Sequence, residues 1–257
     1  MNLNVYKLEC ITNLHVGSGD FNYGVIDNEV ERDCLSENPV IHASGIKGAL
    51  RDAAEKNKLD KIALVFGGKS TDKEDMQSGA YKFFDAQLLL RPLRVSASNE
   101  FSFIRVTTPE IINTFIETVS DFGFNPGVKK INEDFGKNEF LSNKPGIYIE
   151  GDEDKNKAGK MKDESYETLK ALFGEGNYAL VESFKNYKLP VVARNKLGKN
   201  NHLWYEEYVP HHSVFYTMVM SEYAIEGSYI PELVQFGGNA SIGYGYTKIT
   251  AFNNNNR

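Results

Sequence analysis

The stretch HVGSGDFNYGVIDNEVERDCLSENPVIHASGIKGALRD, residues 15–52, decides the fold of this chain. It follows an alternating segment, residues 3–14, that the sequence predicts to be a β-strand ended by the glycine loop. Residues 25–34 then place acidic side chains at alternate positions, so an extended backbone would put them on one face. From Ile46 onward apolar residues recur at helical spacing, and Ser44 is the predicted N-cap.

The composition is that of a globular protein whose net charge does not favour general binding to nucleic acid. Hydrophobic residues make up 41% of the 257 residues, enough for a core in one elaborated domain or two small ones. The net charge is −6, whereas non-specific binding depends on many lysines and arginines that neutralise phosphates. A role in RNA binding therefore requires basic residues gathered on one face, or positive surface supplied by partner subunits.

No leader segment or membrane span is predicted. The first residues mix Lys7 and Glu9 with apolar side chains, and no later segment approaches the length of a span. We therefore expect a cytoplasmic protein without a membrane partner. The two cysteines, Cys10 and Cys34, lack the paired spacing of a structural zinc site, so both are expected to be reduced thiols.

The rest of the chain alternates between predicted strands and two predicted helices. Pro109 lies in the first turn of a helix over residues 107–120, and a shorter helix is expected near residues 166–173. Strands are predicted at residues 81–90, 103–106, 146–150, 178–184, 189–194, 211–220 and 246–252. This arrangement indicates an α+β fold of ferredoxin-like type with large insertions.

Residues 15–52 resemble the RAMP superfamily of CRISPR proteins, and within it the Cas7-like backbone subunit of type III-B Cmr effector complexes. The family pattern is a strand, a His-x-Gly-[SG]-Gly loop, an aspartate-bearing segment, and a helix entry of the form Pro-x-Ile-x-[GA]-Ser-[SG]-[LI]-Lys-Gly-x-[LF]-Arg. Its counterparts are His15, Gly17, Gly19, Asp27, Pro39, Ile41, Ser44, Lys47, Gly48 and Arg51. The segments GAYKFFDAQLLLRPLRV, FIRVTTPEI, HLWYEEYVP and QFGGNASIGYGYTKI continue the resemblance in order along the chain.

The resemblance implies a single RAMP domain over residues 1–257 with a ferredoxin-like, RRM-like core. Insertions are expected near residues 57–80 and 121–165, and a protruding β-hairpin thumb near residues 190–206. Copies of such a subunit stack head-to-tail on the guide RNA (crRNA) as a filament, joined by other Cmr subunits. The resemblance also implies cleavage of the complementary target RNA at regular intervals.

Asp27 is the residue expected to carry the cleavage. It would act as a ligand of Mg²⁺ or Mn²⁺ or as a base, a choice that the sequence leaves open. His15 is expected to carry or orient a proton, and Glu207 to supply a further carboxylate. From its pattern alone, Asp27 would belong to a solvated acidic face. Two other functions stay open: a non-catalytic guide-RNA scaffold of the same or the related Csm complex, and an endoribonuclease that trims precursor guide RNA with His15 or His42.

The expected RNA contacts lie at the helix start, in a glycine-rich turn and on the hairpin. Lys47 and Arg51 are four residues apart, so both would project from one helical face toward phosphates, with Ser44 at the helix entry. Glycines would let the backbone approach RNA closely, although a tight turn explains them equally well. These glycines are Gly237, Gly238, Gly243 and Gly245. The thumb residues are Arg194, Lys196, Lys199, Leu203 and Trp204, of which Trp204 could equally be a core residue.

Overall fold

The computed structural model describes residues 1–19, 24–68, 78–96, 100–149, 157–196 and 202–254. Contacts divide the chain into two compact units, each assembled from segments that are separated in sequence. Unit 1 comprises residues 1–87, 189–211 and 215–251, and unit 2 comprises residues 88–188, 212–214 and 252–257. The predicted mixture of strands and a few helices is confirmed.

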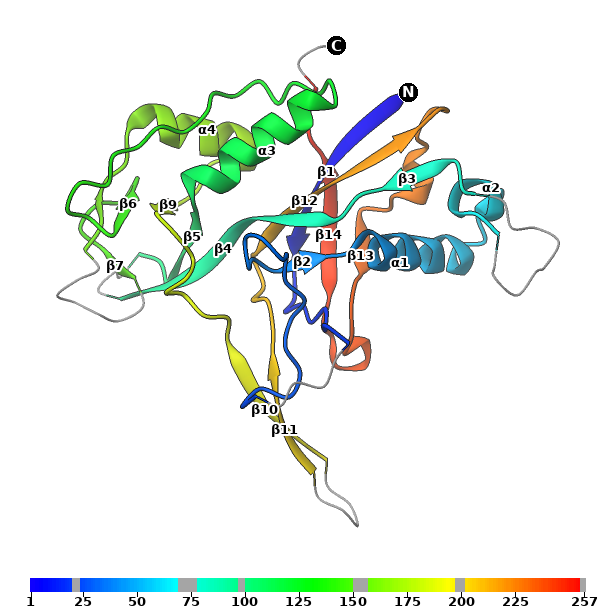
Figure 1. Cartoon of the computed structure of the whole chain (residues 1–257), viewed down its shortest axis with the longest axis horizontal. Helices are drawn as coiled ribbons and strands as arrows, with labels where there is room; N and C mark the ends of the chain where they lie inside the picture. Colours follow the sequence, from blue (N-terminus) through cyan, green and yellow to red (C-terminus); the bar gives the residue numbers. More distant parts are fainter. Residues whose placement is uncertain (20–23, 69–77, 97–99, 150–156, 197–201, 255–257) are drawn as a thin grey trace. The chain divides into compact units, whose positions relative to one another are not determined.

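Unit 1 is built on strands from both ends of the chain (Figure 1). Its strands are paired in the order β13, β14, β1 and β12, with β3 antiparallel to β12. The elements of unit 1 are β1 (Asn2–Cys10), β2 (Val40–Ile41), α1 (Ala43–Lys56), α2 (Ile62–Phe66), β3 (Tyr81–Phe83), β10 (Val191–Lys196), β11 (His202–Glu207), β12 (Val214–Ser221), β13 (Leu233–Gln235), β14 (Tyr246–Ala251) and the 3₁₀ turns Gly227–Tyr229 and Ala240–Ile242. The terminal strand β14 pairs antiparallel with β1, so both ends of the chain hold the same sheet.

The first strand is shorter than the sequence predicts. Strand β1 ends at Cys10, because the amides of Ile11 and Thr12 both donate to the carbonyl of Tyr246. Cys10 is fully buried, and burial raises the pKa of its thiol to about 12. Leu14 then pairs with Val209 through a separate antiparallel bridge.

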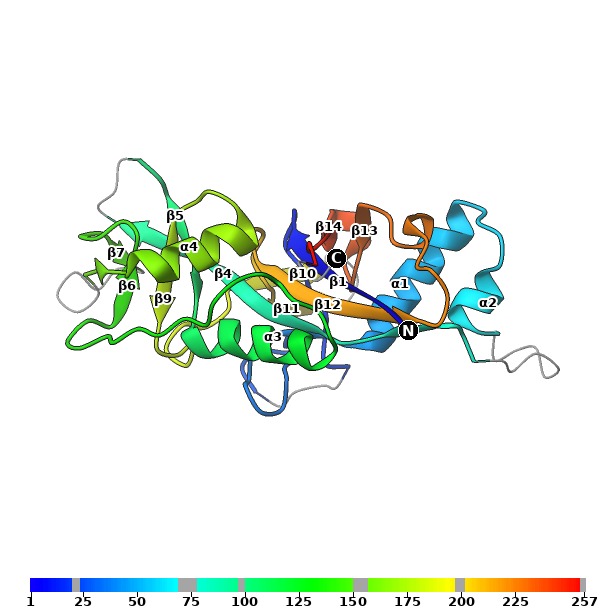
Figure 2. The same cartoon turned by 90° about the horizontal axis from the view of Figure 1, so that it is seen from above.

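Helix α1 is held to unit 1 by one apolar stripe. Ile46, Leu50 and Ala54 recur at intervals of four residues and are buried, as the sequence predicts. Burial of side chains such as Ile46 and Leu50 stabilises the fold by roughly 1.5–3 kcal/mol each. Helix α2 lies beside the C-terminal end of α1 (Figure 1, Figure 2).

Strands β10 and β11 form a two-stranded antiparallel sheet, drawn in yellow to orange in Figure 1. Val191 pairs with Glu207 at one end, and Lys196 pairs with His202 at the other. A hairpin therefore occupies the place where the sequence predicts one, and residues 197–201 between its strands lie outside the described residues.

Among the described residues, unit 2 combines paired strands with the helices α3 and α4. Its strands are paired in the order β4, β5, β9, β6 and β8, and β7 pairs with β4. The elements are β4 (Ala86–Ser96, which begins in unit 1), β5 (Phe103–Thr107), α3 (Pro109–Asp121), β6 (Phe140–Ser142), β7 (Tyr148–Ile149), β8 (Gly159–Lys160), α4 (Asp163–Phe173) and β9 (Tyr178–Val181). The predicted α3 is confirmed: Pro109 is its first residue, and the Thr108 hydroxyl accepts from the Ile111 amide at 3.0 Å.

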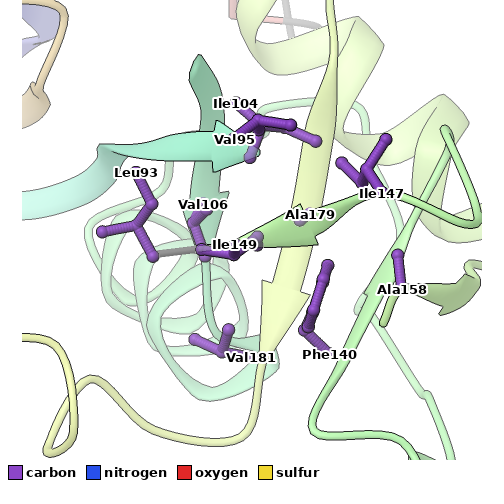
Figure 3. Packing of buried hydrophobic residues seen from close by; sticks show 10 residues of the cluster. All are labelled: Leu93, Val95, Ile104, Val106, Phe140, Ile147, Ile149, Ala158, Ala179 and Val181. Atoms are coloured by element: carbon purple, nitrogen blue, oxygen red, sulfur yellow. The ribbon is translucent and has the colours of Figure 1, made fainter. Parts of the chain in front are cut away.

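The core of unit 2 is apolar (Figure 3). Leu93 and Val106 come from neighbouring strands, and Phe140 and Val181 face them from β6 and β9. This unit contains none of the residues that the sequence singles out for catalysis or RNA binding. In the part of the chain that the structure describes, no helix is both long and apolar enough to cross a membrane.

Candidate functional site

The segment that carries Asp27 is extended, but it is fixed by single bridges instead of a continuous strand. Val30 pairs with Gly17, Arg32 pairs with Pro39, and Asn28 pairs in parallel with Glu206 of β11. The segment thus lies between the glycine loop and the base of the hairpin, all within unit 1. The predicted acidic face is divided among different contacts, since Asp33 closes its own turn by accepting from the Leu35 and Ser36 amides.

Asp27 is anchored to the backbone of β11 through one carboxylate oxygen. Its Oδ2 accepts a hydrogen bond from the Tyr205 amide at 2.7 Å. The Asp27 and Asn28 amides both donate to the Tyr205 carbonyl at 3.1 Å. The side chain is half-buried, and no described residue donates to its other oxygen, Oδ1. The carboxylate is therefore oriented by the fold with one oxygen left for another partner.

His15 is oriented by the same end of β11. Its Nδ1 lies 2.7 Å from the carbonyl oxygen of Glu207, and because a carbonyl only accepts, Nδ1 carries the proton. In neutral His15 the lone pair is therefore on Nε2. A Cβ atom on Gly17 would lie 3.0 Å from Nε2, so glycine at this position leaves that nitrogen uncrowded.

Glu206 and Glu207 are both buried, and each pairs with its own arginine. Glu207 Oε1 lies 2.6 Å from Arg32 Nη2, and its Oε2 accepts from the Val30 amide at 3.2 Å. Glu206 Oε1 accepts from Arg194 at 3.2 Å and from Asn239 at 2.6 Å. Both carboxylates are occupied by their own chain, so the contacts of Glu207 favour a structural role over the predicted catalytic one.

The glycine-rich turn after β13 packs on the loop that carries His15. A Cβ on Gly237 would lie 2.2 Å from the His15 carbonyl oxygen, and a Cβ on Gly245 would lie 1.9 Å from that of Phe236. The fold itself therefore requires glycine at these two positions. Gly243 has a positive φ of 82° with open space around it, and Gly238 would meet only ordinary contacts. Close approach within the chain accounts for half of the predicted RNA-binding glycines.

The predicted N-cap of α1 is wrong. The helix begins at Ala43, so His42 is the N-cap residue and Ser44 lies exposed in the first turn. The capping carboxylate comes from another segment, because Asp85 Oδ1 accepts from the Ala43 amide at 2.6 Å. The local sequence pattern predicted Ser44 as the cap, whereas in the folded chain Asp85 caps the helix.

Lys47 and Arg51 do not share one environment. Lys47 is exposed. Arg51 is only 20% exposed and is tied back to the protein through Glu55 at 3.0 Å and the Gly67 carbonyl at 3.2 Å. Lys47 is therefore the better placed of the two for a phosphate.

The hairpin displays apolar side chains away from the core. Leu203 is 59% exposed, and Trp204 is half-buried with its ring stacked against His202 at 5.7 Å. Trp204 is therefore a hairpin residue and not a residue of the main core. Arg194 instead lies over the Tyr244 ring at 4.9 Å, at the hairpin base. The predicted Lys199 and the side chain of Lys196 lie outside the described residues.

The described residues contain no grouped metal ligands, and the pocket that the structure shows lies in unit 2. In the described ranges, no three His, Cys, Asp or Glu side chains are grouped to hold a metal ion. A pocket of about 390 Å³ lies in unit 2, lined by Lys144, Lys160 and Tyr166 among others, and none of the predicted site residues borders it. The candidate site is therefore defined by the contacts of Asp27 and its neighbours.

A model of the RAMP superfamily matches residues 7–248, so the chain belongs to that superfamily. Within it, the chain is 26% identical to the CRISPR system Cmr endoribonuclease Cmr4 of Pyrococcus furiosus, with 95% of this chain and 93% of the relative aligned. It is 23% identical to the CRISPR system CMR subunit Cmr4 of Saccharolobus solfataricus, with 96% of each chain aligned. The resemblance noted in the sequence is thereby confirmed.

Solved structures agree on the fold. A chain in the cryo-EM structure of the type III-B Cmr-beta complex bound to cognate target RNA superposes with a TM-score of 0.75 at 20% identity, covering 98% of both chains. The crystal structure of oligomeric Cmr4 from Pyrococcus furiosus superposes with a TM-score of 0.72 at 20% identity, again covering 98% of both. The whole chain therefore has the fold of these subunits.

Sequence reasoning missed two residues that build the site. Arg32, which pairs with Glu207, lies in the acidic segment, and apart from its charge nothing in the sequence indicated this contact. Asp85, which caps α1, lies inside the FFDAQL motif, so the motif marked its position without showing its contact.

Proposed function

We propose that this chain is the repeated backbone subunit of a type III-B CRISPR effector complex, which binds guide RNA and cleaves the paired target RNA at regular intervals. The single observation that carries the cleavage step is the placement of Asp27. In a chain similar to a named Cmr endoribonuclease, its carboxylate is half-buried, fixed by the Tyr205 amide and open at Oδ1. Copies of the chain stack head-to-tail along the guide, and other Cmr subunits complete the complex.

The chemistry requires activation of the 2′-hydroxyl and stabilisation of the leaving oxygen. Asp27 accepts the hydroxyl proton, or it holds a Mg²⁺ or Mn²⁺ ion. A single carboxylate fits such an ion, because Mg²⁺ at phosphates is commonly held by one or two carboxylates with substrate oxygens completing its shell. The ion, when bound, supplies charge stabilisation at the phosphate. His15 presents Nε2 as a proton acceptor or, once protonated, as a donor, and Glu207 holds the Asp27 segment in place through Arg32 and Val30.

Binding of guide and target would use different parts of unit 1, which we infer to be the ferredoxin-like RAMP core. Lys47 contacts guide phosphates from the start of α1, and contacts of this kind accept any guide sequence. The β10–β11 hairpin acts as the thumb, with Leu203 and Trp204 set against a displaced base. The net charge of −6 then requires other subunits to supply part of the positive surface.

The test is target cleavage by a complex reconstituted with Asp27→Asn. Asparagine retains an oxygen acceptor for the Tyr205 amide but removes the charge, so the fold should persist while cutting falls by about 100-fold or more. Asp33→Asn, the same change within the same segment, is the control and should leave the rate nearly unchanged. Regular cutting that persists undiminished in the Asp27 variant would leave a guide-RNA scaffold as the better description. Chelation of divalent ions in the wild-type complex tests the metal separately.

A further inference from the structure

A histidine outside the proposed catalytic group joins the two parts of unit 1 that the reaction needs. His42 immediately precedes α1, the helix that carries Lys47. Its Nε2 lies 3.3 Å from Glu31 Oε1, in the segment that carries Asp27, and its Nδ1 lies 3.4 Å from Asp85 Oδ2. The imidazole therefore bridges the Asp27 segment and the carboxylate that caps α1.

The geometry favours a charged imidazole in this bridge. Carboxylate oxygens only accept hydrogen bonds, so both ring nitrogens of His42 must carry protons to bond Glu31 and Asp85 together. The acidic groups facing the ring are Glu31 and Asp33 from the extended segment and Asp85 from the segment before β4. Partial burial lowers the pKa of His42, but the hydrogen bonds and charges of Asp85 and Glu31 outweigh burial and raise that pKa overall.

Both ends of the bridge are rigid. The Glu31 amide donates to the Val16 carbonyl at 2.7 Å, and the Glu31 carbonyl accepts from Val40 at 3.1 Å. The other Asp85 oxygen holds the Ala43 amide at 2.6 Å. A contact between two fixed anchors transmits position from one to the other, which a contact between mobile side chains would not.

We propose that His42 is a positioning residue: its imidazolium, clamped between Glu31 and Asp85, holds the Asp27 segment in register with the guide-binding start of α1. This inference rests on the proposed function for its effect on cleavage, whereas the clamp itself is a property of the isolated chain. In this role His42 acts through Glu31 and Asp85 and not by contact with the reacting atoms. The His42 side chain is 50% exposed, so loss of the clamp should slow cleavage without abolishing it.

The sign of the pH dependence follows from the raised pKa. The charged clamp is fully formed below the ordinary histidine value of about 6.5, and it is lost as the pH rises through the higher pKa of the folded chain. Cleavage by wild type relative to a variant without the imidazole should therefore fall toward equality as the pH rises.

The first experiment measures the His42 ring by NMR titration of the isolated chain. We expect it to titrate above about 6.5, to shift downward in Glu31→Gln, and to stay unchanged in Glu37→Gln, a matched change in the same segment whose side chain does not face the ring. A wild-type value at or below 6.5, or no response to Glu31→Gln, would overturn the clamp. This arm contains no RNA, so it stands even if the Asp27 test fails.

The second experiment compares target cleavage by reconstituted complexes from about pH 6 to about pH 9. His42→Gln should slow cutting by about two- to fivefold at the acidic end, within the range that exposed ion pairs produce, and match wild type at the basic end. His42→Arg keeps a cation at every pH, so its rate should match wild type at the acidic end and exceed wild type by about two- to fivefold at the basic end. A His42→Gln ratio that does not change with pH, in a preparation where Asp27→Asn abolishes cutting, would contradict the positioning role.

Discussion

The base of the hairpin and the start of α1 both carry charged residues at motif positions, but they use them differently. At the hairpin base, Glu206 and Glu207 are buried and paired with Arg194, Asn239 and Arg32. At the start of α1, Ser44 and Lys47 are exposed. The glutamates at the hairpin base stabilise the local structure, whereas the exposed residues at the start of α1 are accessible to a ligand.

The role of a motif residue therefore depends on the residues it contacts and not on its amino-acid type alone. Glu207 was predicted to supply a catalytic carboxylate, yet Glu206 and Glu207 each balance a cation of their own chain, because a buried charge without a partner is costly. Asp27 lies between the two cases, since one oxygen accepts from the Tyr205 amide and no described residue donates to the other. Substitutions at these positions can test which residues stabilise the fold and which take part in function.

The largest effect is expected from Gly245→Ala at the hairpin base. The new Cβ would lie 1.9 Å from the Phe236 carbonyl oxygen, at a residue with a positive φ of 83°. The left-handed backbone and the displaced neighbour together should lower the free energy of unfolding by about 2–5 kcal/mol. Gly243→Ala, with a φ of 82° and no atom within 4 Å, should cost only about 1 kcal/mol. Urea titration measures both, and equal losses would show that packing on the chain does not explain these glycines.

A smaller loss is expected from Glu207→Ala. The substitution leaves the Arg32 guanidinium without its carboxylate and the buried Val30 amide without its acceptor, so the free energy of unfolding should fall by about 2–3 kcal/mol. Glu222→Ala, an exposed glutamate, should change it by less than about 0.5 kcal/mol. Denaturant midpoints with unchanged slopes provide the measurement. A stable Glu207→Ala chain that still fails to cut RNA would restore Glu207 to the catalytic group.

The elements whose residues contact their own sequence neighbours could be predicted well. The stripes of α1 and α3 followed from helical spacing, and the position of Pro109 in the first turn of α3 followed from local chemistry. The hairpin was implied by the family resemblance, and β10 pairs with β11 at that place. In these cases the interactions that decide the structure lie within a few residues of each other.

The sequence indicated a candidate site but not the contacts that orient its residues. Asp27 and His15 were identified by family motif, yet what orients them is the backbone of β11, nearly 200 residues away along the chain. Ser44 was preferred as the cap because no sequence pattern shows that Asp85 reaches the Ala43 amide. Long-range contacts of this kind depend on the assembled sheet, so local pattern could not supply them.

The smallest effect is expected at the start of α1, where the comparison is sharpest. Lys47→Ala should leave the free energy of unfolding unchanged, because the lysine is exposed and no described residue pairs with it. It should weaken guide-RNA binding by about 1 kcal/mol and reduce the slope of log affinity against log salt by about one unit, because one phosphate contact is lost.

Arg51→Ala is the matched change one helical turn further on, and its result should be the reverse. Removing its bonds to Glu55 and the Gly67 carbonyl should lower stability by about 1 kcal/mol and leave the salt slope of RNA binding unchanged. Filter-binding titrations at several salt concentrations, with urea titrations on the same proteins, measure both quantities. The opposite result would be a change in the salt slope with Arg51→Ala and none with Lys47→Ala. In that case, hydrogen bonds within the chain would not predict which cation of α1 contacts the RNA.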